Sequence, residues 1–252
     1  LILYISMSHS PDPGFPEFRV SPEELLEIEE FRQLDYEAIK KYNIPLELMM
    51  ENAGLHLARI IAVHTNKGSN ILVLAGKGNN GGGGLTAARR LACWGYKVSM
   101  YMPDLPGSSL VETQKVRAIN CGVTETDLLG TEKIMRTELM KAEVMVDALL
   151  GFSQRLPLPV SYMEILRYAN GWDGLKISLD MPTGIISDEL SERFPADIIC
   201  TLAAPKKILF QKAANSIIYL ADLGIPKEIY AQKGIVFKIP FEKNSVFTLR
   251  TF

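Results

Sequence analysis

Four consecutive glycines, Gly81 to Gly84, stand between an apolar run at 71–75 and an amphipathic run in this chain. The apolar run has the length of a buried strand, and the amphipathic run has the periodicity of a helix. Glycine costs backbone entropy, so a run of four implies that something comes too close for side chains. The pattern predicts a strand, a glycine-rich turn and a helix that starts at about Gly84. This is an arrangement in which a helix N-terminus can bind an anion.

The rest of the chain repeats this alternation of apolar and amphipathic segments. The predicted strands are at 70–76, 97–103, 143–151, 175–184, 196–206 and 216–226. The predicted helices are at 21–42, 45–65, 84–95, 109–122, 131–142 and 159–171. Apolar strands separated by helices indicate a mostly parallel sheet that is covered on both faces. The sequence therefore predicts an α/β fold.

The N-terminal residues break this pattern. Residues 1–20 are rich in Pro, Ser and Gly and are predicted to form a flexible tail, and residues 21–252 are predicted to form a single domain. Ser21 is a good N-cap, Pro22 suits the first helical position and Glu24 completes a capping box. The first helix is therefore expected to begin directly after the tail.

Composition narrows the possible functions. The chain has 252 residues, is 47% hydrophobic and has a net charge of −2, with a pI near 6.0. Nothing suggests a nucleic-acid partner, and no apolar run reaches the roughly 20 residues that span a bilayer. The three histidines have no metal-ligand spacing, which argues against zinc. We expect a cytoplasmic protein whose three cysteines are buried free thiols: Cys93, Cys121 and Cys200.

Polar residues follow several predicted strands. Asp147 and Asp180 each come after an apolar run, and Lys206 ends another. Carboxyl ends of parallel strands lie at one edge of a sheet, where ligands of such folds bind, so a pocket is predicted there beside Asn79 and Asn80. Each aspartate could instead be a helix cap, and the lysine could be solvated. A G-x-G-x-x-G spacing from Gly76 is weak evidence by itself.

Several stretches occur together and in a fixed order: MENAG (50–54), LAGKGNNGGGGLTAARRL (74–91), VDALLGFS (146–153), LDMPTGI (179–185), TLAAPK (201–206) and LADLGIP (220–226). With these motifs the chain resembles the YjeF N-terminal domain family, the NAD(P)HX epimerases. The resemblance implies a Rossmann-like three-layer α-β-α sandwich. It also implies interconversion of the R and S forms of hydrated NADH or NADPH, as a step of metabolite repair. A separate ATP- or ADP-dependent dehydratase is the implied partner, and a homodimer is the implied assembly.

The resemblance assigns roles residue by residue. Asp180 corresponds to the general acid/base of the reaction. Three residues, Asn80, Asp147 and Thr183, correspond to ligands of a potassium ion, the implied cofactor. The residues implied to contact the substrate are Asn79, Asn80, Gly81, Gly82, Gly83, Gly151, Phe152, Ser153, Gln154, Arg155, Leu156, Pro157, Asp180 and Lys206.

The chain departs from the family pattern at two places. Gly83 stands where the family usually has Asp, and Leu156 and Leu158 replace residues that are often Gly or Arg in relatives. Loss of a charged hydrogen bond would cost about 1.5–3 kcal/mol, while the anion-binding backbone of the loop would remain. Two functions therefore stay open: an active epimerase, or a catalytically degenerate binding or scaffold module of the same fold.

Overall fold

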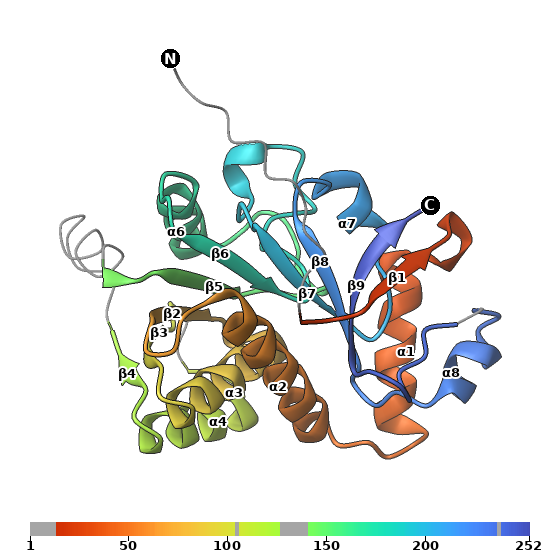
Figure 1. Ribbon diagram of the computed structural model, residues 1–252, viewed down its shortest axis with the longest axis horizontal. Helices are drawn as coiled ribbons and strands as arrows, with labels where there is room; N and C mark the ends of the chain where they lie inside the picture. The colour runs from red at the N-terminus through yellow and green to blue at the C-terminus, as the bar shows by residue number, and fades with distance from the viewer. Residues whose placement is uncertain (1–13, 104–105, 127–140, 236–237) are drawn as a thin grey trace.

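The computed structural model describes residues 14–103, 106–126, 141–235 and 238–252. Within these ranges the strands form one sheet in the order β1-β9-β8-β7-β6-β5-β2-β3-β4 (Figure 1). Every neighbouring pair is parallel except β8 with β9. The strands are β1 Glu17–Val20, β2 Asn70–Ala75, β3 Lys97–Tyr101, β4 Thr124–Glu125, β5 Val144–Ala148, β6 Leu175–Leu179, β7 Ile198–Leu202, β8 Ile217–Ala221 and β9 Val246–Thr251. The predicted mostly parallel sheet is confirmed.

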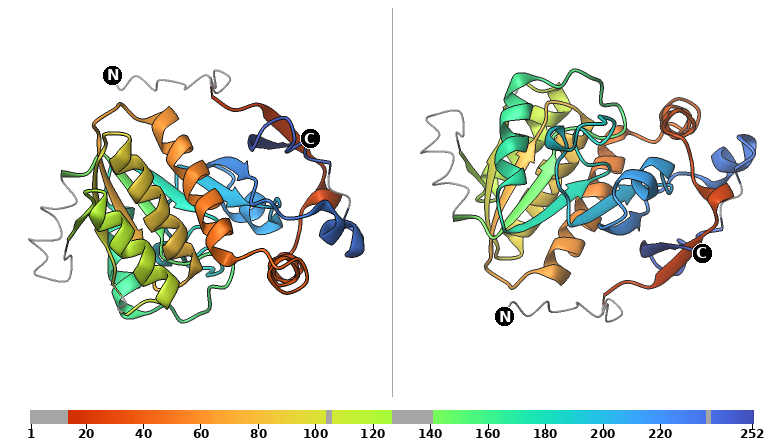
Figure 2. Two further views of the ribbon diagram at one scale, coloured as in Figure 1. Left: turned by 90° about the horizontal axis from the view of Figure 1, so that it is seen from below. Right: turned by 90° about the horizontal axis from the view of Figure 1, so that it is seen from above.

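Helices cover both faces of the sheet. Figure 2 shows α2, α3 and α4 on one face and α6 and α7 on the other, while α1 and α8 lie beside the β9 end. The helices are α1 Ile28–Lys40, α2 Leu46–His64, α3 Asn79–Cys93, α4 Ser109–Asn120, α6 Val160–Asn170, α7 Lys207–Lys212 and α8 Lys227–Gln232. These layers give the predicted α-β-α sandwich.

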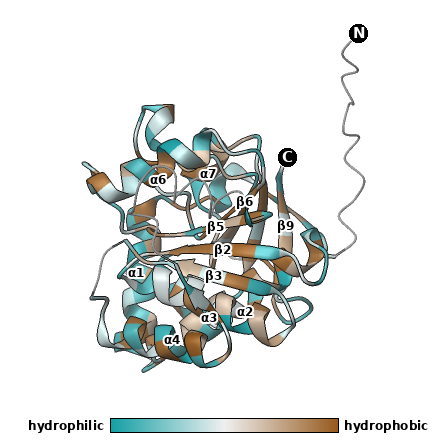
Figure 3. Ribbon diagram, turned by 90° about the vertical axis from the view of Figure 1, so that its left-hand side faces the viewer, coloured by the Kyte–Doolittle hydropathy of each residue, from teal (hydrophilic) through white to brown (hydrophobic). Residues whose placement is uncertain are grey.

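The core lies between the sheet and these helices. All five residues of β5 are buried, as are five of the six residues of β2, because helices cover both faces of these central strands. Figure 3 shows hydrophobic residues along the central strands, while the helices around them carry both hydrophobic and hydrophilic residues. Among the residues described, no helix is both long and apolar enough to cross a bilayer.

The N-terminal segment differs from the prediction. Pro22–Glu24 form only one 3-10 turn, and α1 begins at Ile28. Between them Leu26 forms a β-bridge with Lys206: the amide of Leu26 donates to Pro205 O at 2.9 Å, and the amide of Lys207 donates to Leu26 O at 2.9 Å. A distant contact thus interrupts the predicted continuous helix. The last residues of the predicted tail form β1, which pairs with β9.

Other predictions need correction as well. The short elements β4, α7 and α8 and the antiparallel strand β9 were not predicted, and most of the predicted helix at 131–142 lies outside the described residues. Only Cys200 is buried, whereas Cys93 is exposed and Cys121 is partly exposed. Cys93 ends α3 and Cys121 caps α4, so their apolar neighbours in sequence belong to helix ends near solvent.

Candidate active site

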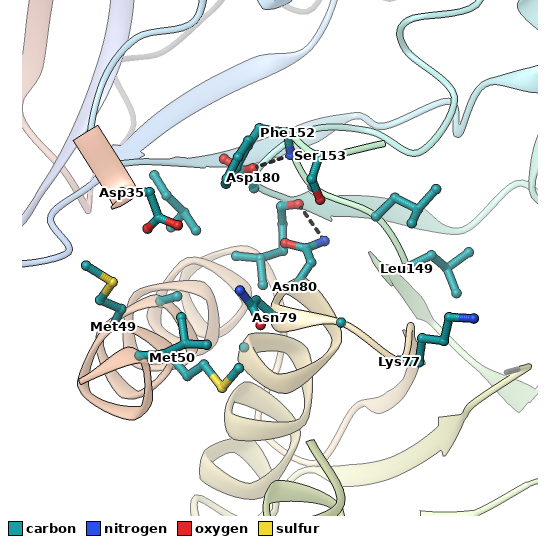
Figure 4. Close-up of a pocket in the computed structure, with 18 of the residues that line it drawn as sticks. Asp35, Met49, Met50, Lys77, Asn79, Asn80, Leu149, Phe152, Ser153 and Asp180 are labelled. Carbon is teal, nitrogen blue, oxygen red and sulfur yellow. Dashed lines mark hydrogen bonds between the residues drawn. The ribbon is translucent and has the colours of Figure 1, made fainter. Parts of the chain in front are cut away.

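A cavity of about 500 Å³ lies at the carboxyl ends of β2, β5 and β6, where the start of α3 meets α1 and α2 (Figure 4). This is the edge of a parallel sheet where ligands of such folds bind. The predicted site residues in its wall are Asn79, Asn80, Gly83, Gly151, Phe152, Ser153 and Asp180. Those that do not line it are Gly81, Gly82, Asp147, Gln154, Arg155, Leu156, Pro157, Thr183 and Lys206.

The four glycines lie within α3 and not in a turn, because the helix begins at Asn79. Close packing against rigid atoms explains Gly81 and Gly84, while Gly82 faces the flexible end of Met50. A Cβ on Gly81 would lie 1.7 Å from Gly76 O, one on Gly82 would lie 2.6 Å from Met50 Sδ, and one on Gly84 would lie 2.4 Å from the Cβ of Ala148. The start of α3 therefore presses against the sheet edge and α2 at distances that exclude side chains.

Gly83 is different from its neighbours. It lines the cavity, and a Cβ there would lie 3.0 Å from Leu179 Cδ2, the flexible end of a side chain. A small movement of Leu179 would make room for a side chain at this position. Backbone packing therefore does not require glycine at position 83, as expected if a side chain has been lost there.

Asn80 connects the start of α3 to the end of β6. Its Nδ2 donates to Leu179 O at 3.2 Å (Figure 4). The loop after β5 passes close by: a Cβ on Gly151 would lie 2.8 Å from Asp180 Oδ2 and 3.2 Å from Asn80 Oδ1. Only glycine at position 151 lets these two polar side chains and the loop meet.

Asp180 directly follows β6 and has a φ of 65°, in the left-handed region that Asp tolerates better than most residues. Its side chain is 2% exposed at the cavity wall. One carboxylate oxygen, Oδ2, accepts a hydrogen bond from the amide of Phe152 at 2.9 Å. The other, Oδ1, lies 2.8 Å from Lys206 Nζ in an ion pair. These two partners fix the position of the carboxylate at the cavity wall.

Lys206 is fully buried, so the solvated alternative for it is wrong. Its Nζ also donates to Thr201 Oγ1 at 3.0 Å and to Leu202 O at 2.9 Å, and it lies 3.7 Å from the ring centroid of Phe31. Burial lowers the pKa of Lys206, and the adjacent Asp180 opposes that shift. Because Lys206 stands behind Asp180 and outside the cavity wall, the structure favours a role as partner of Asp180 over direct contact with a ligand.

The carboxylate of Asp147, near the end of β5, accepts four hydrogen bonds. Oδ1 accepts from Leu149 N at 3.1 Å and from Thr183 Oγ1 at 2.7 Å. Oδ2 accepts from Ser178 Oγ at 3.1 Å and from Thr183 N at 2.7 Å. Burial raises the pKa of Asp147 to about 6 against the opposing effect of these hydrogen bonds.

Among the described residues, the groups that lower the pKa of Asp147 are hydrogen-bond donors of Thr183, Leu149 and Ser178, and none of these donors carries a positive charge. A monovalent cation would supply the missing positive charge. The oxygens of Asp147, Thr183 and Asn80 are of the kind that hard cations prefer, so these residues fit a potassium ion in chemical type. The hydroxyl of Thr183 would have to turn from Asp147 toward the ion.

A comparison with protein families identifies the lineage. Residues 46–208, more than half of the chain, match the family model described as YjeF-related protein N-terminus. The chain belongs to the YjeF N-terminal family. A protein of Dehalogenimonas lykanthroporepellens named NAD(P)H-hydrate epimerase is 34% identical over 220 residues, which are 83% of this chain and 86% of that protein. A protein of the same name from Rhodopirellula baltica is 32% identical over 215 residues, 81% of this chain and 86% of that protein.

Two further similarities add context. The Bifunctional NAD(P)H-hydrate repair enzyme Nnr of Thermofilum pendens is 33% identical over 186 residues, which are 71% of this chain but 35% of that protein. The crystal structure of the yeast protein YNL200c superposes with a TM-score of 0.77 at 22% identity, covering 89% of this chain and 99% of that chain. The yeast structure shares the fold and confirms the predicted architecture.

Residues 151–157, which the family resemblance implies as one substrate-contacting motif, do not all lie at the cavity. Gly151, Phe152 and Ser153 line the cavity. Gln154 is buried instead: its Nε2 donates to Gly151 O at 3.1 Å, and its Oε1 accepts from Gly184 N at 2.7 Å. The rest of the motif, 155–157, is exposed outside the wall. Residues 151–153 of the motif therefore line the cavity, and residues 154–157 do not.

Sequence reasoning missed part of the wall. Asp35 and Phe31 come from α1, which precedes the range of the YjeF N-terminal match, and Met49 and Met50 come from the start of α2. Lys77 lies at the wall just before α3. An amphipathic helix gives no local signal that one of its acids faces a cavity. Lys77 stands beside the glycines in the sequence, and this position was the signal that could have predicted a lysine at the cavity wall.

Proposed function

We propose that this chain is an NAD(P)H-hydrate epimerase, which interconverts the R and S forms of hydrated NADH or NADPH. The observation that carries the proposal is Asp180, a buried carboxylate at the cavity wall held by Lys206 and by the amide of Phe152. Relatives that are 32–34% identical over most of the chain have this name.

The reaction inverts C6 of the hydrated nicotinamide ring, the carbon that carries the hydroxyl. Inversion requires that the C6 hydroxyl leaves and returns, or that the ring opens and closes, and both routes move protons. Lys206 and the amide of Phe152 fix Asp180 in place, which suits a general base. Apolar wall residues around it, such as Phe152 and Leu179, limit water near the reacting ring.

The nucleotide part of the substrate carries phosphates. The N-terminus of α3 lies at the wall with Asn79 and Gly78, and its free amide groups attract negative charge. Lys77 adds a positive side chain at the same place. We assign this end of the cavity to the phosphates and the Asp180 end to the ring.

Potassium is the cofactor implied by the family. Asn80, Asp147 and Thr183 would hold it, and when bound it would supply positive charge beside the buried Asp147 carboxylate. No bond-making step passes through it. We expect KCl to raise the midpoint of thermal unfolding more than choline chloride at equal ionic strength. Equal midpoints in the two salts, with equal activity, would remove potassium from the proposal.

The function is tested by a coupled assay. A mixture of (R)- and (S)-NADHX is treated with an S-specific dehydratase, and the return of NADH absorbance is followed with and without this protein. We expect the protein to speed recovery of the R half, and Asp180→Ala to abolish that effect. If the R half persists at high protein concentration while the nucleotide still binds, the chain is the degenerate binding module that the loss of the family Asp at Gly83 suggests.

A further inference from the structure

We propose that Asp35 is a second acid–base residue of this site, which exchanges a proton with the substrate from a different element of the cavity wall than Asp180. The inference rests on the proposed epimerase function. It assigns to α1, which lies outside the family match, a part in the reaction itself.

Asp35 and Asp180 border one cavity from different elements. Asp35 comes from α1 and Asp180 from the turn after β6, and Figure 4 shows both carboxyl groups at the cavity. Asp35 is partly buried, so its side chain can reach a bound molecule. Within the described residues, no hydrogen bond or ion pair engages the carboxyl group of Asp35. It is therefore available to a ligand, whereas both oxygens of Asp180 have partners.

The position of α1 relative to Asp180 is fixed by packing. Phe31 lies one helical turn before Asp35, on the same face of α1. Its ring centroid lies 3.7 Å from Lys206 Nζ, and its ring packs edge-to-face on Phe152 with the centroids 4.9 Å apart. Phe31 therefore touches both groups that hold Asp180. The same face of the helix brings Asp35 to the cavity.

Contacts at both ends keep α1 in this place. Before the helix, Leu26 bridges to Lys206. Further along it, Glu37 Oε1 lies 2.7 Å from Lys233 Nζ, next to α8. These contacts hold Asp35 in a defined position, as proton transfer requires.

The two carboxyl groups have opposite electrostatic surroundings. Burial raises the pKa of Asp35, the negative charge of Asp180 raises it further, and Lys206 partly offsets both effects. Asp180 has the ammonium group of Lys206 in direct contact. Asp35 therefore has the surroundings of a proton donor, while Asp180 is held by a cationic partner, and such a difference between two acids separates their roles.

Asp35, Asp180 and one water molecule account for every proton and electron pair in the reaction. Asp35 donates its proton to the C6 hydroxyl, the C6–O bond breaks with its electron pair going to oxygen, and the N1 lone pair forms a C6=N1 double bond. Water then attacks the other face of C6, the π pair returns to N1, and one proton of that water passes to Asp180. One turnover moves a proton from Asp35 to Asp180, and proton exchange of both carboxyl groups with water restores the starting state before the next turnover.

The first test compares Asp35→Asn with Asp173→Asn, an exposed aspartate outside the cavity, in the coupled assay. We expect kcat for the R form to fall about 100- to 1,000-fold in Asp35→Asn, with KM changed less than about threefold. Asp173→Asn should match the wild type. If wild-type protein is active and Asp35→Asn keeps kcat within twofold, the inference fails and the epimerase proposal stands. If wild-type protein is inactive, the epimerase proposal itself fails.

A second test separates proton transfer from a structural role. The alkaline limb of the kcat profile, where Asp35 loses its proton in the field of Asp180 and Lys206, should be absent from Asp35→Asn. Formate should restore at least tenfold of the lost activity to Asp35→Ala, because a small carboxylic acid fits the space left by the side chain. If the limb persists and formate has no effect in a variant that keeps the wild-type unfolding midpoint, Asp35 does not transfer the proton.

Discussion

Asp147 and Asp180 both lie near the carboxyl ends of neighbouring strands, Asp147 within β5 opposite Ser178 and Asp180 just after β6, yet their surroundings differ. Both are buried, at 0% and 2% exposure. Asp147 accepts four hydrogen bonds and lies outside the cavity wall. Asp180 accepts one hydrogen bond, pairs with Lys206 and lines the cavity. The same residue type at the same edge thus ties two strand ends together in one case and faces a ligand space in the other.

The difference shows that partners, and not burial, decide what a strand-end carboxylate can do. A carboxylate oxygen has two acceptor positions, so four protein donors fill those of Asp147, and a potassium ion would take the place of the Thr183 hydroxyl. Asp180 has one partner for each oxygen, Lys206 and the amide of Phe152, which leaves acceptor positions free for a substrate. Four substitutions would break or sharpen this contrast.

The largest effect is expected from Asp180→Asn. It should lower kcat about 1,000-fold, because the reacting ring loses its base. It should also lower the free energy of unfolding by about 3–5 kcal/mol, because the buried ammonium group of Lys206 loses its counter-charge. The double variant Asp180→Asn/Lys206→Met should recover most of the stability and none of the activity. Urea unfolding and the coupled assay measure both effects, and a single variant with wild-type stability would contradict the buried ion pair.

Asp147→Asn should act on stability first. Its amide NH2 group would face two donors, so the variant loses about 2–3 kcal/mol of unfolding free energy. The activity of the remaining folded protein should fall less than about tenfold, since residue 147 does not line the cavity. Urea unfolding and the coupled assay at matched folded concentration give the two values. An activity loss equal to that of Asp180→Asn would erase the contrast between the two aspartates.

Gly83→Asp should bring a third carboxylate to the cavity wall. If it forms one charged hydrogen bond to the substrate, kcat/KM should rise about 10- to 100-fold. Gly84→Ala is the control, because its Cβ would lie 2.4 Å from the Cβ of Ala148 and should lower the unfolding midpoint. A folded Gly83→Asp protein with reduced kcat/KM would mean that the site is adapted to glycine.

The smallest effect is expected from Leu156→Ala. Leu156 is 48% exposed and outside the cavity wall, so KM should change less than about twofold. Phe152→Ala is the matched comparison within the same motif. Because Phe152 lines the cavity and packs on Phe31, its truncation should raise KM at least severalfold. Steady-state kinetics with NADHX and NADPHX check both, and similar changes in KM would place the whole 151–157 motif at the substrate.

What could be predicted from the sequence depended on local rules. Asp180 and Asn80 were predicted to meet because the carboxyl ends of parallel strands share an edge. The glycines were correctly expected to mark a close approach, but their place inside α3 was not, because packing overrides low helix propensity. The break before α1 was missed because it depends on a bridge between Leu26 and the distant Lys206. Asp35 was missed for the same reason, since only the tertiary position of α1 turns it toward the cavity.

The four glycines at the start of α3 also bear on the order in which the protein folds. Relative to alanine, four glycines disfavour an isolated helix by about 3–4 kcal/mol. The first turn of α3 therefore gains its stability from the sheet edge and α2, and it can form only after those elements are in place. The floor of the cavity should thus be among the last parts of the described chain to become ordered. Its amides should exchange with solvent sooner than those of β2 and β5, and a bound nucleotide should slow that exchange more there than elsewhere.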